Sequence, residues 1–316
     1  MIDTFGRTIT YLRLSVTDLC NLRCRYCMPS GVRKKQHDQM LTEEETLLAV
    51  SVASELGVTK LRITGGEPLL KKNLLSICEK ASAMNGIEEL SMTTNGTLLP
   101  DLAKDLVRCG VSRINLSIDS LNAEKYRNMT QTGELEDALR GLDAVLLAGF
   151  SKVKINTVLI GGYNDDEIRD FAALTLKYPV DVRFIELMPM HAAESFPKNA
   201  FLSCETVLQV MGEDLSLVKT DGVAQLYRME NAKGHIGLIR PVSESFCASC
   251  NRLRLTADGR IKPCLHDARE IMIKGMNRDE MRQAFLKAAA FKPEKHGELS
   301  CACMSRAGRS MNEIGG

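Results

Sequence analysis

The sequence predicts an α/β protein with a parallel sheet built from six successive βα units, followed by a smaller domain of different organisation. Between about residues 11 and 188, short β-branched runs alternate with amphipathic stretches. After about Met188 this alternation stops. Because a closed barrel needs eight units, we expect an open or partial barrel or a doubly wound sheet, with ligands at the carboxyl ends of the strands.

Each expected strand is a short run rich in apolar and β-branched residues. The runs are Tyr11–Val16, Lys60–Thr64, Glu89–Thr93, Arg113–Ile118, Val153–Ile160 and Asp181–Leu187. Between the first two, Thr42 and Glu45 have the spacing of a capping box, which predicts a helix that Gly57 closes. Gly110 and Gly149 follow later helical segments in the same way.

The second half of the chain predicts fewer regular elements. Residues 189–201 are rich in helix breakers and polar residues, and we interpret them as a linker. A hairpin around Ala257-Asp258-Gly259 and a helix near Arg278–Ala290 are expected beyond it. The chain is therefore divided into a barrel domain (1–188), a C-terminal domain (189–296) and a flexible tail (297–316).

Composition limits the possible functions. The 316 residues include 41 Lys and Arg against 40 Asp and Glu, so no global field exists to hold nucleic acid or an anionic membrane. Neither a leader-like pattern in the first ten residues nor a run of about 18 apolar residues is present, and we expect a cytoplasmic protein. Eleven cysteines in a reducing compartment favour metal or redox chemistry over disulfides.

The first cysteine group consists of Cys20, Cys24 and Cys27, directly after a predicted strand. A structural zinc site normally takes four ligands, whereas this loop offers three. An iron–sulfur cube held by three thiolates keeps one iron free to bind a substrate or cofactor. The alternative is a zinc loop completed from elsewhere in the chain.

The second group, Cys247, Cys250 and Cys264, again supplies three ligands, with His266 as a conceivable fourth. Its spacing alone leaves zinc and an iron–sulfur cluster equally open.

Cations interrupt four of the expected strands. Alternation places each of them on the face opposite its apolar neighbours: Arg13, Arg62, Lys154 and Arg183. If that face lines a cavity, such charges require an anion such as a triphosphate. The alternatives are a solvated face or pairing with Asp and Glu.

Two segments resemble known enzymes. The run Cys20-Asn21-Leu22-Arg23-Cys24-Arg25-Tyr26-Cys27, followed by Gly65-Gly66-Glu67-Pro68, resembles the signature of radical S-adenosylmethionine (SAM) enzymes. Residues 246–264 resemble the C-terminal half of the radical SAM nucleotide cyclases of molybdenum cofactor biosynthesis. The resemblance implies a partial (β/α)6 barrel with a smaller C-terminal domain that carries a second iron–sulfur cluster.

The same resemblance implies an activity and its partners. The enzyme would convert GTP into 3′,8-cyclo-7,8-dihydro-GTP, using SAM and two [4Fe-4S] clusters. It would need an external electron donor and would pass its product to the next enzyme of the molybdopterin pathway. A homodimer is one option for its assembly, and neither nucleic acid nor a membrane is an expected partner.

The resemblance also assigns residues. The six clustered cysteines would be the metal ligands, namely Cys20, Cys24, Cys27, Cys247, Cys250 and Cys264. The SAM site would comprise Tyr26, Gly66, Ser117 and Met188, where Gly66 lets the backbone approach the methionyl group. The GTP site would comprise Arg13, Arg62, Thr93, Lys154, Arg252, Leu253 and Arg254. The catalytic residues would be Arg183 and the terminal pair Gly315 and Gly316, which enters the cavity with help from Arg306 and Arg309.

Other interpretations compete with these assignments. Tyr26 and Met188 could be core residues, and Ser117 and Thr93 could make only local hydrogen bonds. A peptide-modifying radical SAM enzyme is one rival for the whole chain, and a zinc or nucleic-acid binding module is another. Two features depart from the expected pattern, namely His266 and the tail pair of Cys301 and Cys303.

Overall fold

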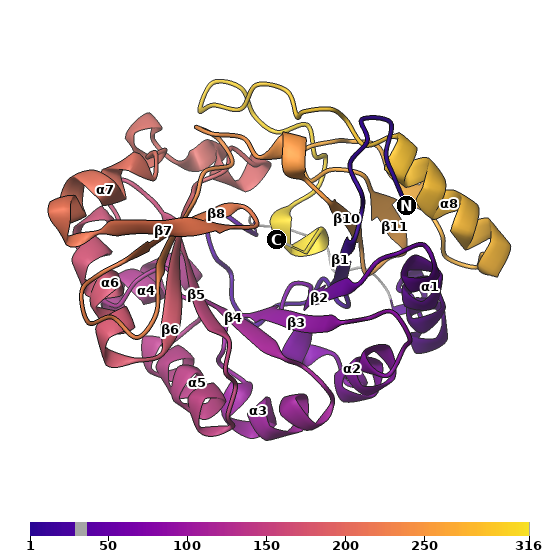
Figure 1. Ribbon diagram of the computed structural model, residues 1–316, viewed down its shortest axis with the longest axis horizontal. Coiled ribbons are helices and arrows are strands. Elements are labelled where there is room, and N and C mark those ends of the chain that lie inside the picture. Colours follow the sequence, from indigo (N-terminus) through magenta and orange to yellow (C-terminus); the bar gives the residue numbers. More distant parts are fainter. Residues whose placement is uncertain (29–36, 316) are drawn as a thin grey trace.

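The computed structural model describes residues 1–28 and 37–315. Within them, one sheet of 12 strands in the order β12-β11-β10-β1-β2-β3-β4-β5-β6-β9-β8-β7 curves into an incomplete ring. Figure 1 shows helices around the outside of this ring and the C-terminal end of the chain near its centre.

The six expected strands are confirmed, with each pairing parallel to the next. Their bounds are β1 Tyr11–Ser15, β2 Lys60–Thr64, β3 Glu89–Thr94, β4 Arg113–Ser117, β5 Val153–Leu159 and β6 Val180–Glu186. Parallel neighbours need a crossover connection, so at least one helix follows each strand and returns the chain to the amino end of the next strand. The partial barrel is therefore the correct member of the expected set.

Helices of the first half cover the outer face of β1 to β6. They are α1 Glu43–Glu55, α2 Leu74–Ser82, α3 Leu99–Arg108, α4 Ala123–Thr130, α5 Leu135–Leu147 and α6 Ile168–Lys177. The capping box predicted for α1 is present, because the Thr42 hydroxyl accepts from the Glu45 backbone and the Glu45 carboxylate accepts from the Thr42 backbone. Gly57 follows this helix with a φ of +93°, a conformation that glycine adopts without strain.

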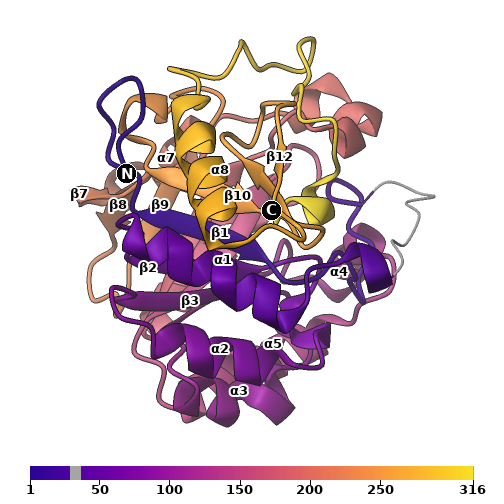
Figure 2. The ribbon, with the colours of Figure 1, turned by 90° about the vertical axis from the view of Figure 1, so that its right-hand side faces the viewer.

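The C-terminal half extends the same sheet at both edges. Strand β9 (Ile236–Ile239) pairs parallel with β6, and β10 (Arg252–Leu255) pairs parallel with β1. The expected hairpin of β10 and β11 (Arg260–Lys262) and the expected helix α8 (Arg278–Ala290) are both present. Figure 2 shows α8 beside α1 on the outer surface. The curved sheet is thereby completed by chain from beyond residue 188.

Sequence analysis missed several elements of this half. They are α7 Glu205–Met211, β7 Ser216–Asp221, β8 Ala224–Arg228, β9 and the short β12 Ile271–Met272. Every residue of β7 is exposed, so its sequence shows no alternation of buried and exposed positions. The expected linker contains two short 3-10 helices, His191–Ser195 and Lys198–Ala200.

The last described residues are packed rather than extended into solvent. A 3-10 turn at Met311–Glu313 lies within the ring in Figure 1. Ala307, Met311 and Ile314 form a small buried cluster with Met190, against which Cys27, Met188 and Leu265 pack. The segment that we expected to be a flexible tail thus ends in the interior. None of the described helices is long and apolar enough to span a bilayer.

Candidate functional site

The inner face of the ring carries a band of cations. Registered neighbours in a sheet share a face, so Arg254 on β10, Arg13 on β1 and Arg62 on β2 lie in one row. Lys154 on β5 and Arg183 on β6 lie on the same face further along the sheet. The alternation predicted from the sequence is confirmed, since Leu12 and Leu14 on either side of Arg13 are fully buried on the other face.

Burial and mutual repulsion lower the pKa of several of these cations. Burial, followed by repulsion from Arg254, holds the pKa of Arg13 well below its usual value. Burial and the charge of Arg252 lower the pKa of Arg254 to about 10, and burial and the charge of Arg183 lower the pKa of Lys154 to about 8. Burial and repulsion both disfavour the charged forms, and a bound anion would favour them, so the interior is suited to bind an anion.

Two of the cations share an acid, as the alternative interpretation expected. Asp221, at the end of β7, lies 2.8 Å from the Arg183 guanidinium and 3.2 Å from the Lys154 ammonium. Asp181 lies 3.7 Å from Lys154. The β7–β8 hairpin that carries Asp221 extends from the ring towards its centre in Figure 1. The Asp221 carboxylate is half-exposed and supplies negative charge to both cations.

Three more residues of the expected GTP group, Arg62, Arg252 and Thr93, have different surroundings. Arg62 donates to Ser91 at 3.3 Å and lies over the ring of Tyr11, which Arg252 also contacts. The Thr93 hydroxyl is buried on the inner face and has no hydrogen-bond partner among the described residues. Such an orphaned group fits a bound polar ligand.

The Leu253 side chain lies on the opposite face of the sheet from the neighbouring arginines. It lies in register with Leu12, is fully buried and belongs to the main hydrophobic core. Alternation therefore turns its side chain away from the inner face, between two arginines that point inwards. The structure separates the Leu253 side chain from the expected GTP group.

The first cysteine loop follows β1 and is folded against the glycine pair of the second motif. The Cys27 N–H donates to the Cys24 carbonyl at 3.0 Å, which turns the loop back on itself. Burial raises the pKa of Cys20 to about 11 and that of Cys27 to about 12, and the charge of Cys20 contributes to the rise at Cys27. Buried thiols that repel one another when ionised fit a group that supplies positive charge.

The structure shows a further reason for glycine at position 66, and the expected approach of a methionyl group stays a prediction. A Cβ there would lie 2.2 Å from the Leu19 carbonyl oxygen, and a Cβ on Gly65 would lie 2.6 Å from the Thr17 carbonyl oxygen. The Gly66 N–H donates to Thr17 O at 2.8 Å. Close approach is thus required, as expected, but it is the cysteine loop itself that approaches. Gly65 and Gly66 set the position of that loop.

Tyr26 lies beside Asp119, an acid just beyond the end of β4 to which sequence analysis gave no specific role. Its hydroxyl donates to Asp119 at 2.8 Å, and the other Asp119 oxygen accepts from the Val158 N–H at 2.9 Å. Burial raises the pKa of Asp119 to about 6. The only sequence signal was its position after β4, where ligand-binding loops are expected.

Glu67 fixes the loops that follow β2 and β3. Its carboxylate accepts from the Thr94 hydroxyl at 2.7 Å and from the Asn95 N–H at 2.8 Å. Burial raises the pKa of Glu67 to about 7. Of the other expected SAM-site residues, Ser117 is partly buried at the carboxyl end of β4, and Met188 packs beside Cys27.

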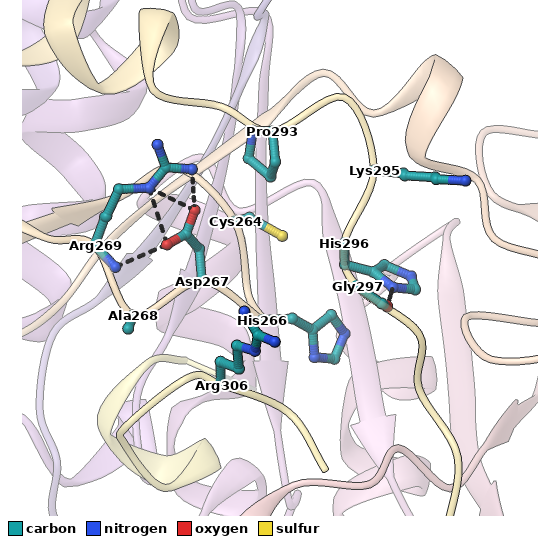
Figure 3. A pocket seen from close by; sticks show the side chains of 10 residues that line it. All are labelled: Cys264, His266, Asp267, Ala268, Arg269, Pro293, Lys295, His296, Gly297 and Arg306. Carbon is teal, nitrogen blue, oxygen red and sulfur yellow. Dashed lines mark hydrogen bonds and ion pairs between the residues drawn. The ribbon is translucent and has the colours of Figure 1, made fainter. Parts of the chain in front are cut away.

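The second cysteine group lies beside a cavity of about 360 Å³. Figure 3 shows Cys264, His266 and His296 around this cavity, together with Lys295 and Arg306. The two histidine rings are 5.0 Å apart in an edge-to-face arrangement.

Two cysteines of this group lie in a positive environment. Although burial opposes it, hydrogen bonding from His296 lowers the pKa of Cys247 to about 7. Burial likewise opposes the shift at Cys250, where the charges of Lys292 and Arg252 lower the pKa. Partly buried thiols surrounded by cations are suited to bind as thiolates.

The end of the chain packs near both cysteine groups, because Cys27 and Leu265, the residue after Cys264, contact its buried cluster. Arg254 donates to the carbonyls of Ile314 at 3.1 Å and Gly315 at 2.7 Å. A Cβ on Gly315 would lie 2.1 Å from the Thr64 hydroxyl, so only glycine fits there. Arg309 anchors this segment through Asp258 and Glu270, both within 3.1 Å.

Three sequence expectations for the tail have different outcomes. Gly316 lies outside the described residues. Arg306 lines the cavity near Cys264, and its expected help in placing the terminal residues stays a prediction. Cys301 and Cys303 are exposed thiols in a turn closed by paired backbone hydrogen bonds between Ser300 and Cys303.

No group of three or more His, Cys, Asp or Glu side chains in residues 1–28 and 37–315 is arranged to hold one metal ion. An iron–sulfur cube is a different case, because each thiolate binds a different iron of the cube. The fit of the cysteines to such clusters depends instead on their number, burial and charged surroundings.

Comparison with known proteins identifies both halves of the chain. The family model described as "Radical SAM superfamily" matches residues 14–175, and the model described as "Molybdenum Cofactor Synthesis C" matches residues 180–298. A relative from Alkaliphilus metalliredigens named GTP 3′,8-cyclase is 46% identical, and each chain is covered completely. Relatives of the same name from Alkaliphilus oremlandii and Desulforamulus reducens are 44% and 42% identical, again over both full lengths.

Solved structures share the fold at low sequence identity. Streptococcus suis SuiB bound to S-adenosylmethionine is 15% identical with a TM-score of 0.61, covering 85% of this chain and 62% of SuiB. The protein anSMEcpe with bound AdoMet is also 15% identical with a TM-score of 0.61, covering 90% of this chain and 81% of that one. These similarities show that the chain shares the fold of both proteins.

Proposed function

This chain belongs to the radical SAM superfamily and, within it, to the family of the GTP 3′,8-cyclases, and on that basis we propose that it converts GTP into 3′,8-cyclo-7,8-dihydro-GTP. This reaction is the first step of molybdenum cofactor biosynthesis. Two [4Fe-4S] clusters and SAM are the cofactors, and together they supply the one-electron chemistry that removes hydrogen from ribose C3′ before C3′ bonds to guanine C8.

The observation that carries the proposal is the convergence of three features on one interior. Two groups of three cysteines, on loops far apart in sequence, both pack near the chain end, since Cys27 and Leu265 contact the same cluster. The band of cations lies on the inner face of the same sheet. A nucleotide triphosphate is a ligand that such a cation-rich interior would hold.

The residues then take distinct roles. Cys20, Cys24 and Cys27 would hold the first cluster, and Cys247, Cys250 and Cys264 the second. Around SAM we place the Tyr26 and Asp119 pair, with Ser117 and Met188, whereas Gly66 positions the cysteine loop. The cations Arg13, Arg62, Lys154, Arg183 and Arg252 would bind GTP together with Thr93.

Arg254 and Gly315 have a role at the chain end. Arg254 donates to the carbonyls of Ile314 and Gly315. The glycine backbone thereby lies beside the carboxyl ends of β1 and β2. A backbone without side chains leaves room for substrate there, and its N–H and carbonyl groups are available to orient the substrate and exclude water. Gly316 would extend this contact by one residue.

Anaerobic incubation tests the function. Purified protein reconstituted with iron and sulfide is mixed with dithionite, SAM and either GTP, ATP or a peptide, and 5′-deoxyadenosine and the cyclised nucleotide are measured. We expect both products with GTP alone. Cys24→Ala and Cys264→Ala should each lose iron and activity, whereas the exposed Cys301→Ala serves as a matched control. Zinc without iron, or product formation only with peptide, would overturn the proposal.

Three finer expectations belong to this proposal. The eleven cysteines are all free thiols, which supports a reducing compartment such as the cytoplasm. An external protein would donate electrons, and the next enzyme of the pathway would receive the product. The option of a homodimer is testable by light scattering of the reconstituted protein.

A further inference from the structure

Lys292 is a buried cation that neither the sequence motifs nor the expected binding groups include. It follows helix α8 by two residues and is 3% exposed. Its ammonium donates to the Arg252 carbonyl at 2.9 Å and to the Pro263 carbonyl at 3.1 Å. Among the described residues it forms no ion pair with a carboxylate.

The two carbonyls locate this charge beside the second cysteine group. Arg252 is two residues beyond Cys250, and Pro263 immediately precedes Cys264. Lys292 therefore lies beside the two segments that carry Cys250 and Cys264, two of the three candidate cluster ligands.

Two other cations near this site, Arg7 and Lys262, differ from Lys292 because each has a carboxylate partner. Arg7 also reaches this site, through the Cys247 carbonyl at 2.7 Å, but it is paired with Asp3 at 2.5 Å. Lys262 is paired with Glu270 at 3.1 Å. Since burying a charge without an opposite charge is strongly unfavourable, the position of Lys292 calls for a negative group at the cysteines.

We propose that Lys292 is the charge partner of the second iron–sulfur cluster, stabilising its thiolate ligands and its reduced state. Reduction adds one electron to the cluster, and a fixed ammonium beside two ligating sulfurs favours the more negative state. Lys292 thus raises the midpoint potential and helps retain the cluster. Lys292 is a positioning residue that tunes the cluster. The inference rests on the proposed function only because it requires a cluster at Cys247, Cys250 and Cys264.

The test uses the full chain with Cys20, Cys24 and Cys27 replaced by Ala, so that all iron reports on the second site. Lys292→Gln removes the charge and keeps donors for the carbonyls, Lys292→Met removes both, and Lys292→Arg keeps the charge. The matched control is Lys287→Met, an exposed lysine on α8. The midpoint potential is measured by dithionite titration followed by electron paramagnetic resonance, and iron content and thermal unfolding are measured in parallel.

We expect the Gln and Met variants to have a more negative potential or a lower iron content, with Lys292→Arg and Lys287→Met close to the parent. The cluster-free Gln variant should unfold near the parent temperature. An unchanged potential in a fully loaded Gln variant would refute the role of Lys292, and so would loss of folding in both charge-removing variants before iron is added. A parent chain that assembles no cluster at this site would instead refute the proposed function.

Discussion

Replacing Gly66 by alanine tests how the first cysteine loop is positioned. The added Cβ would lie 2.2 Å from the Leu19 carbonyl oxygen and 2.5 Å from its carbonyl carbon. Both are backbone atoms, so relief requires the loop to move by roughly 1 Å before ordinary contact is restored. Overpacking of this kind costs about 1–3 kcal/mol. Because Cys20 is the residue after Leu19, the same movement displaces a proposed cluster ligand.

The melting temperature and the iron content both report this displacement. In a chain whose second-site cysteines are replaced by alanine, Gly66→Ala should lower the melting temperature and reduce the iron bound at the first site. Gly297→Ala is the control, since a Cβ there meets nothing within 4 Å. If Gly66→Ala retained both the parent melting temperature and a full first cluster, the argument from close packing would be refuted. A loss of SAM binding with the cluster intact would favour the original reason for this glycine.

Three further predictions concern charge and the chain end. Asp221→Asn removes the acid shared by Lys154 and Arg183, so inorganic triphosphate should bind about three- to tenfold more tightly by calorimetry; unchanged or weaker binding, or the same gain in the surface control Asp214→Asn, would contradict this. The pKa of Glu67, raised by burial from 4.5 to about 7, means that the folded chain holds an extra proton between these values. Stability should therefore fall by about 3 kcal/mol as pH rises through that window, and melting curves of Glu67→Gln should lack this fall. Deletion of Gly315 and Gly316 should abolish cyclisation while both clusters assemble, as judged by product analysis and iron content; undiminished product would exclude a role for the chain end.

Much of the fold was predictable because its signals are local. The capping box at Thr42, the β-branched runs of β1 to β6 and the hairpin around Asp258 each lie within a few residues of sequence. Strand β7 was missed because all its residues are exposed, so no period of two marks it. Strand β9 was missed because Ile236–Ile239 is too short to be distinguished from a buried loop.

The candidate site was predictable to a similar extent. Three-cysteine spacing and the cations between apolar residues indicated a metal centre and an anion site. Neither pattern could show that Asp221 pairs with Lys154 and Arg183. Neither could show that the Leu253 side chain faces the core or that Asp119 meets Tyr26. Each of these facts depends on which distant segments become neighbours.

By itself, the sequence determined the kind of chemistry, because ligand number, residue type and strand alternation are properties of short segments. Only the tertiary structure decided where that chemistry is assembled. It brought β10 beside β1, placed Lys292 between two cysteines and folded the chain end against Arg254. These contacts join residues that are 29 to 241 positions apart in the sequence, so no short segment contains a signal for them. Their stability comes from the burial and charge compensation of the whole assembled sheet, which no short segment contains.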